Sequence, residues 1–178
     1  LWTLEAKSPS TVSWLSEWDA WNSFPEGAWV KAEGMRPSGE YDDSPPTKCI
    51  VLKKLIKKEA NQITLEVVYG MYPEKETLHR FSQGWECNIC KQPNLGHYRL
   101  GAESPEKVGL GTREVSAVKL TMVWNSCQKD GKNRSSDFGI YSKEIPGWRV
   151  KTEDWKVIDF GVRAEDSAKA AEEANNQG

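Results

Sequence analysis

The stretch Arg113–Asn125, REVSAVKLTMVWN, decides the fold class of this chain. From Val118 onward every second side chain is apolar, and Lys119 and Thr121 lie between. Successive side chains of an extended chain point to opposite faces, so this period of two gives one apolar and one solvated face. The apolar face consists of Val118, Leu120, Met122 and Trp124. The stretch therefore predicts a half-buried β-strand.

Segments of the same kind lie on both sides of this strand. Cys49–Lys57 is expected to form a hairpin with Gln62–Tyr69, where apolar and polar residues alternate. Tyr72–Gly111 has the least regular pattern, and Gly84–Gly96 within it is interpreted as a loop. Further strands are predicted at Ala28–Ala32, Glu76–Phe81, Phe138–Ser142, Trp148–Thr152 and Trp155–Val162. No helix alternates with these strands, so the sheet is expected to be mostly antiparallel.

One amphipathic helix is predicted over Thr11–Asn22, with Ser10 as its cap. Trp14, Trp18 and Trp21 fall on one face of that helix. Such a face is typical of a packed core, and it would equally suit the wall of an apolar cavity or a docking surface.

The fold class expected from these patterns is mainly β. We predict a curved antiparallel sheet, a half-barrel of about seven or eight strands, packed on the N-terminal helix. Residues 1–164 are expected to form a single β-rich domain, and residues 165–178 a flexible or helical tail.

Charge and hydropathy narrow the function classes. The 178 residues carry a formal net charge of -2, which argues against a dedicated nucleic-acid binder. No apolar run is long enough to span a membrane. A basic stripe is interpreted as a solvated strand edge, with peripheral contact to lipid headgroups or an acidic partner as the alternative. Its members are Lys53, Lys54, Lys57 and Lys58.

The start of the chain favours export. Leu1 is not preceded by methionine, and removal of a secretory signal is the commonest natural origin of such a start, an unresolved segment being the alternative. The even count of four cysteines fits an oxidising compartment. We therefore expect a periplasmic or extracellular protein.

The cysteines allow several chemistries. Cys49 and Cys127 are candidates for a disulfide across the sheet and Cys87 and Cys90 for a local one, although four cysteines permit three connectivities. Zinc bound by all four is an alternative. A redox pair at Cys87 and Cys90 is another.

A haem site is the last alternative at this motif. Cys87-x-x-Cys90-Lys91 resembles the lysine-terminated haem-attachment sequence of nitrite-reducing cytochromes, and the resemblance implies His97 or His79 as an axial ligand. No cofactor is the first expectation, with haem c or zinc at Cys87 and Cys90 as alternatives.

No enzyme signature is present. The chain has two histidines, and neither lies in a recognisable nucleophile motif. Gly109-Leu110-Gly111 precedes a predicted strand instead of a helix, which argues against dinucleotide binding. The sequence therefore predicts a protein that is not an enzyme.

Two segments carry a resemblance to a known family. Residues 21–30, WNSFPEGAWV, and residues 141–151, YSKEIPGWRVK, resemble the opening and closing motifs of secreted bacterial proteins of planctomycete type. Asp159-Phe160-Gly161 is similar to their last strand. The resemblance implies export and a half-barrel like that of lipoprotein carriers, a curved sheet that wraps a helix over an apolar cavity.

The function expected is non-catalytic binding or docking by an exported bacterial protein. An apolar, tryptophan-lined site would take a lipid-like ligand or a protein partner. Its candidate residues are Trp14, Trp18, Trp21, Trp29 and Trp124. The alternatives are an accessory structural subunit of a cell-envelope complex and a haem electron carrier using Cys87, Cys90 and Lys91.

Overall fold

A computed structural model describes residues 16–36, 45–80, 98–125 and 134–162, with the side chains of 98–100 and 124–137 left undescribed. Nine strands form one antiparallel sheet in the order β4-β3-β2-β1-β9-β8-β7-β6-β5. The ends of this order, β4 and β5, are not paired with one another, so the sheet is open. The fold class predicted from the sequence, a mainly β antiparallel sheet, is confirmed.

Neighbours in the chain are mostly neighbours in the sheet. In the first half β1 (Trp29–Arg36), β2 (Thr47–Lys58), β3 (Gln62–Tyr69) and β4 (Tyr72–His79) form a meander, and β2 and β3 form the predicted hairpin. The second half runs back toward β1 through β5 (Tyr98–Leu110), β6 (Arg113–Asn125), β7 (Arg134–Tyr141), β8 (Arg149–Thr152) and β9 (Trp155–Gly161). Pairing of β1 with β9 joins the two halves.

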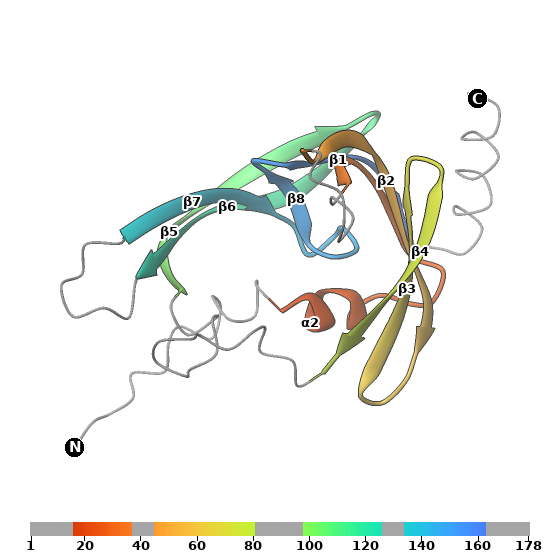
Figure 1. Ribbon diagram of the computed structural model, residues 1–178. Helices are drawn as coiled ribbons and strands as arrows, with labels where there is room; N and C mark the ends of the chain where they lie inside the picture. The colour runs from red at the N-terminus through yellow and green to blue at the C-terminus, as the bar shows by residue number, and fades with distance from the viewer. Residues whose placement is uncertain (1–15, 37–44, 81–97, 126–133, 163–178) are drawn as a thin grey trace, which may run out of the picture.

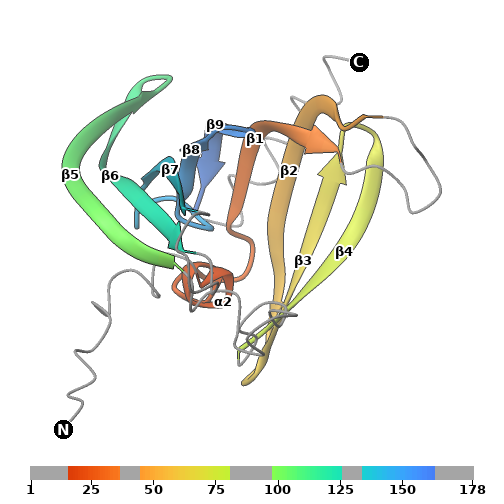
Figure 2. The same cartoon turned by 60° about the vertical axis from the view of Figure 1, so that its left-hand side comes forward.

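The sheet is strongly curved, and the helix α2 (Glu17–Asn22) lies in its concavity (Figures 1 and 2). Its N-cap is Ser16, whose Oγ accepts a hydrogen bond of 3.2 Å from the amide of Asp19. The predicted cap, Ser10, and the predicted first part of the helix lie outside the described residues.

The main core lies between α2 and the concave face. It joins Trp21 of the helix to alternate residues of the strands, as expected for side chains on one side of a pleated sheet. Its buried members include Val30, Ala32, Val51, Leu55, Ile63, Leu65, Val67 and Val157. Burial of each such aliphatic side chain contributes roughly 1.5–3 kcal/mol before entropic costs.

Two sets of hydrogen bonds fix the end of α2 to β2. The ammonium of Lys58 donates to the carbonyls of Asn22 at 2.8 Å and Phe24 at 3.1 Å. The backbone of Leu55 accepts from Gly27 and donates to Ala28, each at 2.8 Å. The Lys58 bonds satisfy carbonyls at and just after the helix end, and the Leu55 bonds join the residues that follow the helix to β2.

The first residues of β6 extend beyond the end of β7, since β7 pairs only with the part from Val118 onward. Residues of the turn that follows β7 form hydrogen bonds with this unpaired part of β6. Ser142, 1% exposed, donates from Oγ to the carbonyl of Ser116 at 2.7 Å. Glu144 accepts the amide of Ser116 at 2.6 Å. Side chains therefore replace a strand partner at this point.

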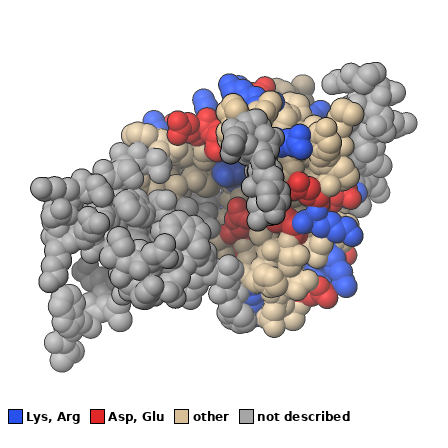
Figure 3. All heavy atoms as spheres, in the orientation of Figure 1, with Lys and Arg blue, Asp and Glu red and all other residues tan. Residues whose placement is uncertain are grey.

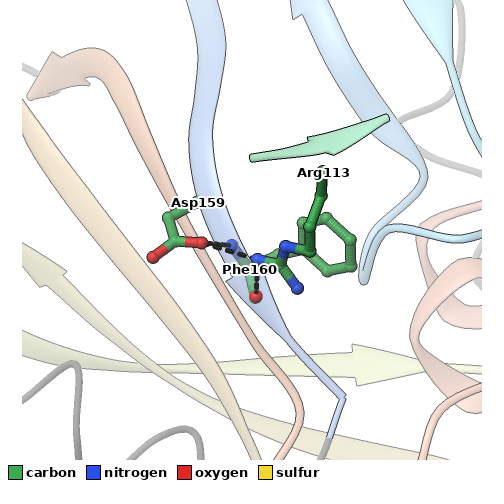
Figure 4. Close-up of polar contacts among 3 residues, drawn as sticks. All are labelled: Arg113, Asp159 and Phe160. Atoms are coloured by element: carbon green, nitrogen blue, oxygen red, sulfur yellow. Dashed lines mark hydrogen bonds and ion pairs between the residues drawn. The ribbon is translucent and has the colours of Figure 1, made fainter. Parts of the chain in front are cut away.

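Arg113, at the start of β6, contacts residues of β9 through its side chain (Figure 4). Its guanidinium forms an ion pair of 2.6 Å with Asp159 and lies 4.0 Å from the ring centroid of Phe160. It also donates to the carbonyl of Phe160. The start of β6 is thereby tied to β9, although two strands stand between β6 and β9 in the sheet order.

Both outer strands carry features that discourage pairing with another chain. In β4 these are Pro73 and the exposed Glu74 and Lys75, and in β5 Pro105 and the exposed Lys107. Proline lacks the amide that a new strand would use, and charges oppose its approach.

The strands differ from the sequence-based expectation in number, nine instead of about seven or eight, and in several of their bounds. The strand β5 was not predicted, because Gly101, Pro105 and Gly109 interrupt any apolar alternation. The strand predicted to begin at Trp148 begins at Arg149, because Trp148 has a φ of 59°, outside the extended region. The strand β4 begins at Tyr72, earlier than the predicted Glu76.

Candidate binding cavity on the concave face

A cavity of about 120 Å³ lies where α2 meets the concave face of the sheet. The ten described residues that line it come from α2, from five strands and from the turn after β7. They are Ser16, Glu17, Trp21, Val30, Lys53, Tyr141, Pro146, Gly147, Arg149 and Trp155. A cavity of about 150 Å³ can hold benzene, so this one holds a group of nearly that size.

Two indole rings supply the aromatic walls, and two glycines make room for them. A Cβ at Gly34 would lie 2.9 Å from Val51 and 3.3 Å from the Trp155 ring, so this ring lies directly on the backbone of β1. Gly147 has a φ of 81°, and a Cβ there would lie 3.2 Å from Nε1 of Trp21. A larger residue at Gly34 would press on Trp155, and a larger residue at Gly147 would press on Trp21.

Trp155 is held in place from two further sides. Its indole nitrogen donates to the carbonyl of Arg149 at 3.1 Å. The guanidinium carbon of Arg149 lies 4.4 Å from a Trp155 ring centroid, and Nζ of Lys53 lies 5.5 Å from it. Both cations therefore lie over the negative face of the indole, a favourable arrangement.

The two cations differ in their ion pairing. Lys53, whose side chain is 13% exposed, has Glu76 of β4 at 3.6 Å. Arg149 is half-buried and has no carboxylate within 4.0 Å among residues 16–36, 45–80, 98–125 and 134–162. Glu17, the acidic residue of the lining, is exposed to solvent.

Three groups of the lining have hydrogen-bond donors to spare. Within the described part of the chain, no oxygen accepts from the Lys53 ammonium within 3.5 Å, from the Arg149 guanidinium or from the Trp21 indole nitrogen. Lys53 and Arg149 are only partly buried, so water can also reach their donors. These three donors are therefore available to a ligand in the cavity.

Tyr69 stands beside this cavity, half-buried in β3. Burial raises the pKa of its phenol above the ordinary value of 10.0, electrostatic interaction with Glu76, Glu74 and Cys49 raises it further, and Arg149 lowers it. The phenol is therefore neutral at physiological pH.

The predicted tryptophans are only partly brought together. Trp21 lines the cavity, and Trp18 packs against the same core with the Arg80 guanidinium 5.4 Å from its ring centroid. Trp29 does not line this cavity, because strand alternation turns it to the face opposite Val30. Trp14 and the side chain of Trp124 lie outside the described residues.

Most of the cysteine-centred predictions fall outside the described part of the chain. This holds for Cys87, Cys90, Lys91, His97 and Cys127. Cys49, in β2, is a free thiol packed partly against the core, so its predicted disulfide with Cys127 gains no support. Among the described residues no group of three or more histidine, cysteine or acidic side chains is placed to hold a metal ion.

The basic stripe is a case that sequence reasoning misjudged. Lys53 points into the concave face and Lys58 binds the end of α2, so two of its four members are not solvated edge residues. Arg149, Tyr141 and Trp155 were not predicted as site residues at all. They come from separate strands, and no short motif links them.

The described surface carries no large patch of one charge on the face seen in Figure 3, where basic and acidic side chains intermingle. Within the described ranges, no helix has the length and apolar character that crossing a bilayer requires. No protein-family model, curated protein or solved structure matches the chain. The resemblance to secreted half-barrel proteins therefore stays a prediction.

Proposed function

We propose that this chain is a non-catalytic binding protein that takes a small organic group into the cavity between α2 and the concave face. One observation carries the proposal: the indole rings of Trp21 and Trp155 line a space of about 120 Å³ beside the main core. Ligand sites are typically concave, largely aromatic and supplied with a few polar groups.

The size of the cavity limits the ligand. Sites for drug-sized molecules span about 300–1,000 Å³, so a cavity of about 120 Å³ takes one end of such a molecule and not the whole. A lipid-like ligand, as expected from the sequence, would insert one terminus. Export to the periplasm or outside the cell remains part of this proposal and rests on the sequence.

Binding without catalysis is favoured by the kind of residues in the lining. The ten lining residues include rings, two cations and one exposed carboxylate, and none of these ten is a cysteine or histidine. Rings and fixed cations bind and orient a ligand, whereas covalent catalysis needs an activated nucleophile beside a base.

The test is an NMR titration that follows the indole N–H signals of the ¹⁵N-labelled protein. Benzyl alcohol, benzoate and octanoate are the probes. We expect at least one probe to shift the Trp21 and Trp155 signals saturably and to leave the Trp29 signal in place, since Trp29 lies on the opposite face. If no probe moves Trp21 or Trp155 in the folded protein, the proposal fails.

A pair of variants connects binding to the cavity. Val30→Ile adds a methyl group to the lining, and Val67→Ile adds the same group to a buried core position outside it. Both changes overpack the core to a similar degree. We expect Val30→Ile to weaken probe binding and Val67→Ile to leave it unchanged. Equal effects of the two variants would contradict a binding site at this cavity.

A further inference from the structure

The cavity lining includes three hydrogen-bond donor groups, which bear on the kind of ligand that it would take. Its donors are the ammonium of Lys53, the guanidinium of Arg149 and the indole N–H of Trp21, none with a hydrogen-bond acceptor in the described part of the chain. A neutral aromatic or aliphatic group would fill the space without a charged acceptor for these donors, whereas an anion would form charge-assisted hydrogen bonds with them.

The charges near the cavity favour a negative occupant. Glu76 lies 3.6 Å from Lys53 and is not itself part of the lining, so it offsets one cation from outside. Glu17 is exposed, where water screens its charge. The guanidinium of Arg149 remains, half-buried and without a carboxylate partner in the described ranges.

The guanidinium is also oriented. The ring of Trp155 covers one of its faces at 4.4 Å, and the same ring is fixed by its hydrogen bond to the Arg149 carbonyl. A planar fork of N–H groups held in this way matches the two oxygens of a carboxylate. A carboxylate on a small apolar body would meet the cations with its oxygens and the indole rings with its body.

We infer that the ligand of this cavity is a carboxylic acid, bound as the anion with its carboxylate at Arg149 and Lys53 and its apolar part between Trp21 and Trp155. This inference rests on the proposed function and specifies the ligand class of that same site. Arg149 would be the residue that determines specificity for the acid over a neutral ligand of equal size.

Calorimetric titration of the full chain with benzoate and with benzyl alcohol tests the inference. The two probes have similar size and differ in charge. We expect benzoate to bind about tenfold or more tightly than benzyl alcohol, because charge-assisted hydrogen bonds form with the anion alone. If benzyl alcohol binds as well as benzoate, the site is neutral and the inference fails while the proposed function stands. If benzoate, benzyl alcohol and octanoate all fail to bind, the proposed function itself fails.

Variants of Arg149 test whether this side chain causes the preference for benzoate over benzyl alcohol. Arg149→Gln is expected to reduce benzoate affinity about tenfold or more and to change benzyl alcohol affinity by less than about twofold. Arg149→Lys, which keeps the charge without the fork, is expected to fall between Arg149→Gln and the original protein. The control is Lys156→Gln, which removes an exposed cation from the opposite face of β9.

Two results would overturn the assignment. One is an Arg149→Gln protein that stays folded in thermal melts and binds benzoate as before. The other is a loss of benzoate affinity in Lys156→Gln that equals the loss in Arg149→Gln. The affinity would then depend on the net charge of the protein and not on Arg149 itself. Lys53→Met tests the second cation of the lining, and we expect it to lower the affinity for benzoate as well.

Discussion

At the scale of single residues, side chains complete backbone pairings that the strands leave open. Ser142 is the clearest case, since its Oγ donates to the Ser116 carbonyl and accepts the amide of Glu144 at 3.2 Å. Ser142 is 1% exposed, so its own hydroxyl depends on these protein partners. Ser142 is polar although it is buried, because it bonds the part of β6 that β7 does not reach.

Ser142→Ala removes both part-buried hydrogen bonds, so we expect it to lower the free energy of unfolding by about 1 kcal/mol. Ser104→Ala, at an exposed position of β5, is the control and is expected to change the free energy by less than about 0.5 kcal/mol. Urea denaturation of both variants measures the difference. Equal stabilities would contradict the role given to Ser142.

The raised pKa of Tyr69 gives the fold a dependence on alkaline pH. A group whose folded pKa lies above its unfolded value of 10.0 contributes stability that is complete below that value and is lost as pH rises through the folded pKa. We therefore expect the free energy of unfolding to fall as the pH rises above about 10, and to fall less in Tyr69→Phe. Urea denaturation below and above this pH measures the decline. An identical decline in Tyr69→Phe would show that other groups cause it.

At the scale of elements, α2 depends on its surroundings. A helix of six residues is too short to persist alone, so tertiary contacts must hold it. Those contacts are the burial of Trp21 in the concave core and the bonds from Lys58 to the carbonyls at its end. Because Trp21 forms a wall of the cavity, the stability of this helix also determines the shape of the site.

Lys58→Met removes both carbonyl bonds and keeps most of the apolar stem. We expect a loss of about 1–3 kcal/mol in the free energy of unfolding and weaker protection of the α2 amides in hydrogen exchange. Lys57→Met is the matched control, because Lys57 is exposed and has only a surface ion pair with Glu59. Similar losses in the two variants would contradict the anchoring role of Lys58.

Sequence patterns predicted the elements better than the site. The alternation in Arg113–Asn125 and Gln62–Tyr69 correctly predicted strands, because a half-buried strand leaves a period of two in the sequence. The strand β5 leaves no such period, since its residues are mostly exposed at the edge. A cavity whose lining comes from five strands depends on tertiary curvature, to which local patterns are blind.

At the scale of the whole molecule, an open curved sheet must hold its two halves together without closing a barrel. The pairing of β1 with β9 does so through the backbone. The contact of Arg113 with Asp159 and Phe160 does so through side chains at the point where β6 lacks its neighbour. Both the backbone pairing and the side-chain contact therefore join β9 to another part of the sheet.

Arg113→Gln is expected to lower the free energy of unfolding by about 1 kcal/mol, the modest value typical of exposed pairs with some ring contact. Lys107→Gln is its control, because the Lys107–Glu114 pair is exposed and joins residues within one hairpin. We expect that control to match the original protein in thermal melts. A larger loss in Lys107→Gln than in Arg113→Gln would contradict the link to β9.

The central claim is that the concave cavity binds a small carboxylate between two indole rings. A crystal structure of the protein grown with benzoate tests it most directly. The account predicts electron density for benzoate between Trp21 and Trp155, with its carboxylate at hydrogen-bond distance from Arg149. Benzoate bound elsewhere, or a cavity that holds only water at saturating benzoate, would contradict the account.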